Sequence, residues 1–228
     1  MSRESGVGSR DGGVDSRFPA HHSRILYFHG FASSPASAKI TALHPLLEAH
    51  GIELDTPDLN VPSFAQLDWN AMIERAMEHA RANPPHGLVG SSLGALVALE
   101  VVRRGVEVPL VLIAPAIGVG ARWETRLPDG DPVMVWNHAL NANVPIHRAF
   151  FDQLNTLGVD EQPPPTRVTA FMGRRDETVP FEVVEERWKR WESLGLAPGS
   201  RFVVFDEGDH GLTAYVGDIA EAIVNMVS

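Results

Sequence analysis

The residues best able to do chemistry lie in the pentapeptide Gly90-Ser91-Ser92-Leu93-Gly94. Its pattern, G-x-S-x-G, is typical of a nucleophile elbow, a tight turn between a strand and a helix that exposes a serine hydroxyl. Gly90 and Gly94 suit such a turn because neighbouring backbones must pass close to it, where a Cβ would clash. The pattern therefore predicts that Ser92 is a nucleophile. The alternative is an ordinary turn with Ser92 as the N-cap of the following helix.

A nucleophilic serine needs a base and an acid, and in esterases of this type the acid and then a histidine follow the serine along the chain. Asp176 comes just after a predicted strand, and His210 follows the last predicted strand. We expect His210 to remove the proton of Ser92 and Asp176 to hold the imidazole in the required tautomer. The alternatives are a turn or N-cap role for Asp176 and a surface-loop role for His210, one of ten histidines.

Other carboxylates lie close to these two residues in the sequence. Glu177 follows Asp176 directly and is the rival acid, although we expect its side chain to point elsewhere. Three more carboxylates flank His210 and are interpreted as solvated loop charges or local helpers, namely Asp206, Glu207 and Asp209. Asp176 is the predicted acid because it stands directly after a strand and before the histidine.

The tripeptide His29-Gly30-Phe31 follows the first predicted strand, where such enzymes present a backbone N–H group to the oxyanion. The predicted oxyanion hole is the N–H of Phe31 together with the N–H of Leu93. Gly30 lets the backbone turn toward the substrate, and His29 is expected to orient this loop. A metal site of His29, Asp176 and His210 is disfavoured because no H-E-x-x-H or similar ligand spacing occurs. We expect no metal and no other cofactor.

The elements that must position these residues are short apolar strands that alternate with amphipathic helices. This alternation predicts an α/β fold with a mostly parallel sheet covered on both faces. Active sites of such sheets lie at the carboxyl ends of the strands, where all of the candidate residues fall. Strands are expected at residues 24–28, 52–54, 87–89, 108–115, 167–173 and 201–205, and helices at 37–50, 67–83, 93–101, 182–194 and 214–227.

The chain of 228 residues is long enough for one domain with a sizeable core. We expect a single domain over residues 24–228. Residues 1–23 are rich in Gly, Ser, Arg and Asp and are predicted to be a disordered tail. Residues 118–165 are long for a connection, contain several prolines, and are predicted to be an irregular lid or substrate-pocket segment.

Composition excludes several classes of function. The net charge is −10 and no run of Lys or Arg stands out, so we expect no nucleic-acid partner and no docking to anionic membranes. No signal-peptide core is expected because residues 1–23 contain no apolar run, and no membrane span is expected because no window approaches about 20 apolar residues. The absence of cysteine excludes disulfides and thiol catalysis. It suits a cytoplasmic protein, and we expect a monomer or small homo-oligomer.

Residues 29–39 read H-G-F-A-S-S-P-A-S-A-K. This run resembles the motif H-G-F-x-S-S-P-x-S-x-K of the YqiA-type small bacterial esterases of the α/β-hydrolase superfamily, whose elbow reads G-S-S-L-G as at residues 90–94. The resemblance is close over residues 25–47 and 87–99 and thin over 53–86 and 118–165. It implies an α/β-hydrolase fold and carboxylesterase activity on short acyl esters. Carried over residue by residue, it also points to Ser92, Asp176 and His210.

The expected function is hydrolysis of a small-molecule carboxylic ester through an acyl-enzyme on Ser92. A thioesterase or another acyl hydrolase would use the same parts, and a non-catalytic hydrolase-fold protein that binds a ligand is a further alternative. Ser37 is interpreted as a helix cap, and a role of Lys39 in binding a polar group of the substrate is left open. Three aromatic residues are candidates for an acyl pocket or for core packing, namely Trp123, Trp136 and Phe151.

Overall fold

The computed structural model describes residues 23–118, 127 and 129–228. The predicted tail therefore lies outside the described residues, apart from Ser23, which begins the first strand. The core is a sheet of six parallel strands in the order β2-β1-β3-β4-β7-β8. These strands are β1 (Ser23–Phe28), β2 (Ile52–Asp55), β3 (Gly87–Ser91), β4 (Leu110–Ile113), β7 (Val168–Gly173) and β8 (Arg201–Phe205).

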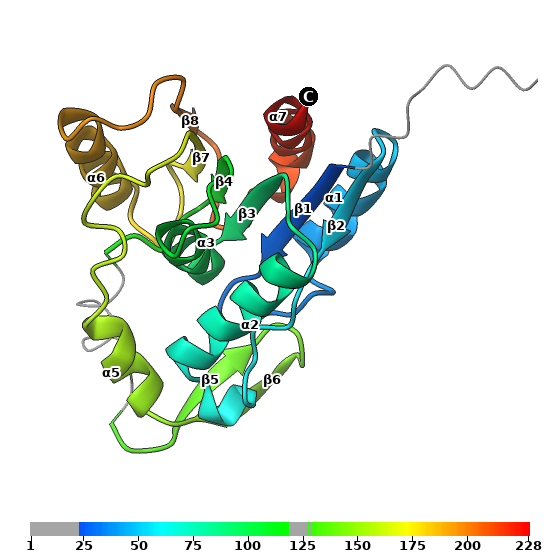
Figure 1. Ribbon diagram of the computed structural model, residues 1–228. Helices are drawn as coiled ribbons and strands as arrows, with labels where there is room; N and C mark the ends of the chain where they lie inside the picture. The colour runs from blue at the N-terminus through cyan, green and yellow to red at the C-terminus, as the bar shows by residue number, and fades with distance from the viewer. Residues whose placement is uncertain (1–22, 119–126, 128) are drawn as a thin grey trace, which may run out of the picture.

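Helices cover both faces of this sheet (Figure 1). Two glycines of β3 show which helices lie on which face. A Cβ at Gly87 would come within 2.4 Å of Met226 in α7, whereas a Cβ at Gly90 would come within 2.6 Å of Ala95 in α3. α1 packs beside α7, and α2 packs on α3. The helices are α1 (Ala38–Glu48), α2 (Trp69–Ala82), α3 (Leu93–Arg103), α6 (Phe181–Ser193) and α7 (Val216–Val227), with short 3-10 turns η1 (Phe64–Gln66) and η2 (Thr213–Tyr215).

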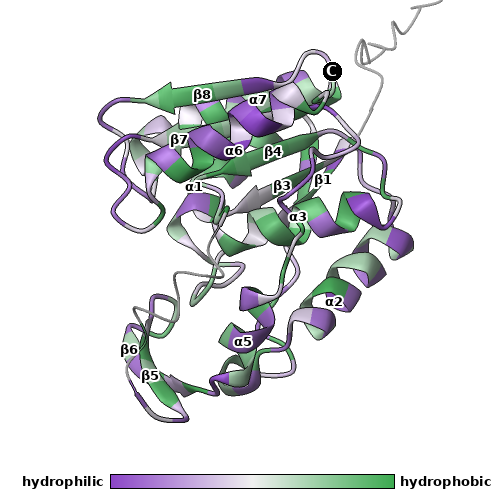
Figure 2. Ribbon diagram, turned by 90° about the vertical axis from the view of Figure 1, so that its left-hand side faces the viewer, coloured by the Kyte–Doolittle hydropathy of each residue, from purple (hydrophilic) through white to green (hydrophobic). Residues whose placement is uncertain are grey.

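The centre of the core is formed by β3, β4 and α3. Every residue of β3 and β4 is buried, as expected for parallel strands covered on both faces. Helix α3 buries nine of its eleven residues because it lies between the sheet and α2. Figure 2 shows hydrophobic colour along the sheet and mixed colour on the outer helix α2. The predicted α/β architecture is therefore confirmed, and none of the described helices has the length and apolar content needed to cross a membrane.

The described part of the segment 118–165 is more regular than expected. β5 (Val133–Asn137) and β6 (Ala142–Ile146) form an antiparallel hairpin, and α5 (Ala149–Asn155) follows it. The expectation of an irregular segment is wrong here. Burial alternates along much of both strands, the pattern of a half-buried strand. The Pro145 within β6 hides this signal, because proline is depleted in strands.

This hairpin is tied to the sheet domain by backbone hydrogen bonds. The His138 N–H donates to the Ala32 carbonyl at 2.8 Å, and the His147 N–H donates to the Ala65 carbonyl at 2.9 Å. In α5, the Gln153 side chain accepts a hydrogen bond from the backbone N–H of Trp69 at 2.8 Å. The insert therefore contacts the loop after β1, η1 and the start of α2.

Candidate active site

The candidate residues gather where the strand order reverses. β1 has β2 on one side and β3 on the other, so the chain leaves β1 and β3 toward opposite sides of the sheet. Such a switch point leaves a crevice at the carboxyl ends of the strands. His29 follows β1 and Ser92 follows β3, while Asp176 and His210 follow β7 and β8. The structure therefore brings the predicted residues to one edge of the sheet.

The turn at residues 90–94 has the backbone of an elbow. Ser92 has φ 54° and ψ −118°, a conformation that costs a residue with a Cβ about 1–3 kcal/mol. A Cβ at Gly90 would lie 2.4 Å from the Gly94 carbonyl oxygen, and a Cβ at Gly94 would lie 2.1 Å from the Phe28 carbonyl oxygen. Both positions therefore require glycine, as the sequence predicted. The Ser92 side chain makes no capping hydrogen bond, which argues against a simple N-cap.

Ser92, His210 and Asp176 form one hydrogen-bonded chain. The His210 Nε2 lies 3.0 Å from the Ser92 Oγ, and the His210 Nδ1 lies 2.8 Å from the Asp176 Oδ2. The Asp176 side chain is fully buried, whereas that of His210 is 24% exposed. The second oxygen of Asp176 accepts hydrogen bonds from the backbone N–H groups of Thr178 at 2.9 Å and Val179 at 2.8 Å. The carboxylate is thus fixed on both oxygens, with one of them aimed at the imidazole.

Two glycines hold the acid and histidine loops together, namely Gly208, one of the two glycines that flank His210, and Gly173, which the sequence did not single out. A Cβ at Gly173 would lie 2.1 Å from the Gly208 carbonyl oxygen, and a Cβ at Gly208 would lie 2.9 Å from the Gly173 Cα. The Arg175 N–H also donates to the Gly208 carbonyl at 2.9 Å. Gly173 ends β7 and Gly208 lies in the loop after β8, so the contact joins residues that are far apart in the sequence and no local pattern pairs them.

The rival carboxylates have other partners or other directions. Asp206 accepts a hydrogen bond from Arg174 at 2.7 Å, and Glu207 accepts one from Arg175 at 2.6 Å. Asp209 accepts the backbone N–H of Leu212 at 2.8 Å and so shapes the loop after β8. Glu177 is exposed, and the carboxylate at hydrogen-bond distance from the His210 Nδ1 is that of Asp176.

His29 is buried in the loop after β1. Its Nδ1 lies 2.9 Å from the Gly30 carbonyl oxygen, and its Nε2 accepts the backbone N–H of Leu59 at 3.0 Å. Burial lowers its pKa, although hydrogen bonding to Gly30 and the charge of Asp58 oppose this. These contacts favour a neutral ring that joins two loops, in agreement with an orienting role. Among the described residues no group of His, Asp and Glu has a metal-binding arrangement.

Gly30 and Phe31 lie beside the elbow. A Cβ at Gly30 would approach the Ser92 Cβ to 3.1 Å, so the loop passes directly over the serine. Phe31 packs in an aromatic cluster, with ring centroids 5.7 Å from Phe64 and 5.8 Å from Phe151. Of the two roles considered for Phe151, acyl pocket and core packing, these contacts support core packing. The cluster fixes the Phe31 side chain in the loop whose Gly30 lies against Ser92, and Ser92 directly precedes α3.

A cavity of about 580 Å³ opens at Ser92 and His210. The loop after β1, the first turn of α1 and the β5–β6 hairpin form its walls. Trp136, one of the three candidate pocket aromatics, lines it and is 47% exposed. Trp123 lies outside the described residues. The hairpin also contributes Val135 and His138 to the wall.

Lys39 reaches this cavity from the first turn of α1. Its ammonium donates a hydrogen bond to the Ser91 Oγ at 2.9 Å. Burial lowers its pKa to about 8, opposed by the negative charges of Asp176 and Asp209. Ser37 stands at the N-cap position of α1, but its side chain makes no capping hydrogen bond, so the capping interpretation of this residue is wrong for the side chain.

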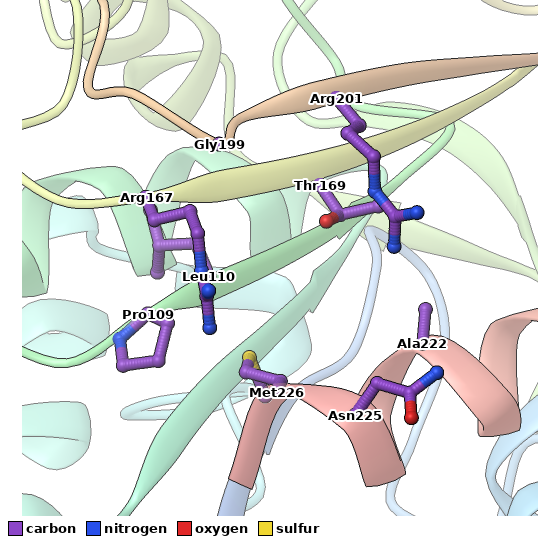
Figure 3. Close-up of a pocket in the computed structure, with 9 residues that line it drawn as sticks. All are labelled: Pro109, Leu110, Arg167, Thr169, Gly199, Arg201, Ala222, Asn225 and Met226. Atoms are coloured by element: carbon purple, nitrogen blue, oxygen red, sulfur yellow. The ribbon is translucent and has the colours of Figure 1, made fainter. Parts of the chain in front are cut away.

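A second, smaller cavity of about 130 Å³ lies at the opposite end of the sheet. Figure 3 shows Arg167 and Arg201 extending from the amino ends of β7 and β8 toward Asn225 and Met226 near the end of α7. None of the candidate active-site residues lines it. The cavity at the carboxyl ends of the strands is therefore the one associated with Ser92.

Comparison with known protein families supports this description. Residues 24–226 match the model of the uncharacterised protein family UPF0227. The chain belongs to this family. The match extends over nearly all of the sheet domain, and it confirms the resemblance of the UPF0227 chain to YqiA-type proteins of the α/β-hydrolase superfamily.

Solved structures show that the UPF0227 chain has the α/β-hydrolase fold. It is similar to Est1E from Butyrivibrio proteoclasticus with bound ferulic acid, with a TM-score of 0.72, 16% identity, and coverage of 92% of this chain and 91% of that one. Mouse alpha/beta hydrolase domain-containing protein 10 gives a TM-score of 0.71, 18% identity, and coverage of 90% and 89%. The esterase domain of a Rhodothermus marinus protein gives 0.67, 19%, and coverage of 94% and 90%.

Proposed function

We propose that this UPF0227 protein is a serine hydrolase that cleaves small carboxylic esters. The observation that carries the proposal is the continuous chain from Ser92 Oγ through His210 to the buried Asp176, with Ser92 on a strained elbow. A ligand-binding protein has no need of a serine held at 3.0 Å from a histidine nitrogen that is itself oriented by a carboxylate. The esterases among the similar structures agree with this proposal.

In the proposed mechanism, Asp176 holds the His210 proton on Nδ1, which leaves Nε2 free to accept the proton of Ser92. The Ser92 oxygen attacks the ester carbonyl, and His210 then donates that proton to the departing alkoxide. Water, activated by the same imidazole, hydrolyses the acyl-enzyme and restores the serine. The proton taken from Ser92 leaves with the alcohol, and the proton taken from water returns to Ser92. The three residues therefore need no cofactor for this cycle.

The oxyanion is assigned to the N–H groups of Phe31 and Leu93. The Gly30 contact and the aromatic cluster hold the loop over Ser92, while Leu93 begins α3, whose amino end carries a partial positive charge. Donors of this kind are each worth a factor of about 10²–10³ in rate. The hairpin residues Val135 and Trp136 are assigned to the wall of the acyl or alcohol pocket.

Labelling with a fluorophosphonate probe, followed by peptide mapping, tests the proposal. We expect one adduct, located on Ser92 rather than on the adjacent Ser91, and loss of labelling in Ser92→Ala. Heat-denatured protein is the control, because it keeps both serines but loses the His210 contact. Absence of an adduct, or equal labelling after denaturation, would favour a non-catalytic ligand-binding protein. Parallel rates on p-nitrophenyl acetate and acetyl-CoA separate an esterase from a thioesterase.

A further inference from the structure

The chain contains only two lysines, and they stand in opposite environments. Lys189 is on the outer face of α6, where its side chain is 66% exposed and pairs with Glu185 at 2.9 Å. Lys39 instead lines the cavity that opens at Ser92. Burying an ammonium group is costly unless something in the structure or a ligand compensates the charge. The position of Lys39 therefore calls for a physical explanation.

Within the protein, the charge of Lys39 is only partly compensated. Its hydrogen-bond partner among the described residues is the neutral Ser91 Oγ, and no described carboxylate lies within salt-bridge distance of its Nζ. Asp176 and Asp209 act on it through space, but the oxygens of Asp176 already bind His210 and two backbone N–H groups, and Asp209 accepts the backbone N–H of Leu212. An ammonium group has three donors. The structure thus leaves donor capacity on Lys39 at the cavity.

The Lys39 ammonium is also held in place. Ser91, which accepts its hydrogen bond, is the last residue of β3 and is hydrogen-bonded to the buried Tyr27 of β1. Burial raises the pKa of this Tyr27 hydroxyl far above its usual range, so the phenol is neutral. The ammonium is therefore anchored to β3, one residue before Ser92, and through Ser91 to β1.

The first turn of α1 adds to the positive character of this wall. Ser37, Ala38 and Lys39 all line the cavity. The Ser37 hydroxyl makes no capping hydrogen bond, and no acidic side chain occurs in the first turn. The amino end of a helix carries a partial positive charge and favours anions. A lysine and a helix amino end thus face the same cavity in a chain whose net charge is −10.

We propose that Lys39, with the first turn of α1, binds a carboxylate carried by the ester, so that the enzyme prefers anionic esters over neutral esters of the same shape. The inference rests on the proposed function and names the substrate class of that site. Lys39 is then a specificity-determining residue. The carboxylate belongs to either the acyl or the alcohol part of the ester, because both parts extend from the scissile carbonyl into the same cavity.

The carboxylates at the cavity do not take the place of a bound anion beside Lys39. Glu177 is exposed at the edge of the cavity, where water screens its charge. The titratable groups that line the cavity with Lys39 or act on its charge are Tyr27, His29, His138, Asp176, Glu177, Asp209 and His210. Among them, the carboxylates of Asp176 and Asp209 accept backbone hydrogen bonds, which hold them in the loops after β7 and β8.

The test compares isosteric ester pairs in the full-length protein at neutral pH. On the acyl side, monomethyl succinate is compared with methyl 4-methylpentanoate, and on the alcohol side acetoxyacetate is compared with isobutyl acetate. Hydrolysis is followed by acid release in a pH-stat. The variants are Lys39→Gln and Lys39→Arg, and Lys189→Gln is the matched control because it removes the same charge from the surface.

We expect wild type to prefer the anionic member of at least one pair. Lys39→Gln should lower kcat/KM for that member by about 10–100-fold, the loss typical of a hydrogen bond to a charged group. Its loss on the neutral partner should be much smaller, because that ester carries no charge for Lys39 to bind. Lys39→Arg should keep part of the preference. The pair that responds identifies the side of the ester that carries the charge.

Two results would overturn the proposal. The first is an equal loss on both members of each pair in Lys39→Gln, which indicates that Lys39 only positions Ser91. The second is the absence of any anionic preference in wild type while neutral esters are hydrolysed at Ser92. If no ester is hydrolysed and the fluorophosphonate probe does not label Ser92, the proposed function itself is refuted. That outcome differs from the two results above, in which the protein is an active hydrolase.

A binding measurement keeps the inference testable if a Lys39 variant does not fold. Reductive methylation of wild type labels the two lysines, and mass spectrometry reports each one separately. Succinate and glycolate should each be tested as ligands, and at least one should slow methylation of Lys39 several-fold without affecting Lys189. Equal methylation of Lys39 with and without both anions would contradict the proposal.

Discussion

Replacing Asp176 by Asn tests whether this carboxylate sets the tautomer of His210. In the native structure, Oδ1 accepts two backbone N–H groups at 2.9 and 2.8 Å, while Oδ2 lies 2.8 Å from the His210 Nδ1. Asparagine has one oxygen and one NH₂ group. Its oxygen must stay with the two buried backbone donors, because leaving them unpaired costs about 1–3 kcal/mol each. The NH₂ group is thereby turned toward His210.

An NH₂ group facing Nδ1 requires that Nδ1 accept a hydrogen bond, and the ring proton then moves to Nε2. This nitrogen lies 3.0 Å from the Ser92 Oγ and can no longer accept the serine proton. We expect kcat/KM on p-nitrophenyl acetate to fall by about 10⁴-fold, the loss known for the corresponding change in a serine protease. At about 1.4 kcal/mol per factor of ten, this is about 5 kcal/mol of transition-state stabilisation.

The stability of the variants separates this effect from simple unfolding. Asp176→Asn keeps the two backbone hydrogen bonds, so its Tm should change by only a few degrees. Asp176→Ala removes both acceptors, and its Tm should fall further, by about 2–4 °C for each kcal/mol lost. Glu177→Gln is the matched control, because it makes the same chemical change at an exposed neighbour. Its activity should remain within about threefold of wild type, as for most surface substitutions.

Activity of Asp176→Asn within about tenfold of wild type would refute the reasoning on the tautomer. A large loss in Glu177→Gln with a small loss in Asp176→Asn would move the acid to the neighbouring residue. Loss of the folded state in Asp176→Asn, seen by circular dichroism, would contradict the assignment of the two backbone hydrogen bonds to the asparagine oxygen.

Three further predictions follow from the described geometry. His210→Ala should abolish turnover of p-nitrophenyl acetate while circular dichroism and Tm stay close to wild type, since this side chain is partly exposed; activity near the wild-type value would assign the base to another histidine. Gly173→Ala should separate the loops of the acid and the histidine, because its Cβ would lie 2.1 Å from a backbone oxygen, and should lower both Tm and activity; unchanged activity would contradict this. The preference for anionic esters should persist below pH about 8 and decline above it, because Lys39, whose pKa is about 8, loses its charge there; a pH-independent ratio of anionic to neutral kcat/KM would argue against a role for that charge.

Much of the site was predictable because it lies at strand ends. Short apolar runs locate buried parallel strands, and the carboxyl ends of parallel strands meet at one edge of the sheet. Ser92, Asp176 and His210 each follow such a run, so their convergence follows from the order of the elements alone. The glycines at positions 90 and 94 were also predictable, since the contacts that exclude a Cβ are made by the turn and the neighbouring strand.

The missed features depend on contacts between distant parts of the chain. The Lys39–Ser91 hydrogen bond joins residues 52 positions apart, and the Gly173–Gly208 approach joins two loops that no sequence pattern pairs. Ser37 occupies the N-cap position, but its hydroxyl makes no capping hydrogen bond. The β5–β6 hairpin was missed because Pro145 interrupts its second strand. In each case the contacts depend on how distant segments pack together, which the local sequence does not specify.

The anchoring of the insert has a consequence for protein engineering. The hairpin and α5 are fastened to the Ala32 carbonyl, the Ala65 carbonyl and the start of α2, and Gln153 also donates to Asp68 at 2.7 Å. Exchanging this insert for that of another hydrolase, in order to transfer its substrate selectivity, would leave these groups of the sheet domain without their hydrogen-bond partners. The transferable unit is therefore the insert together with the loop after β1 and residues 64–69. A chimaera built on the insert alone should be less stable than one that carries the whole unit.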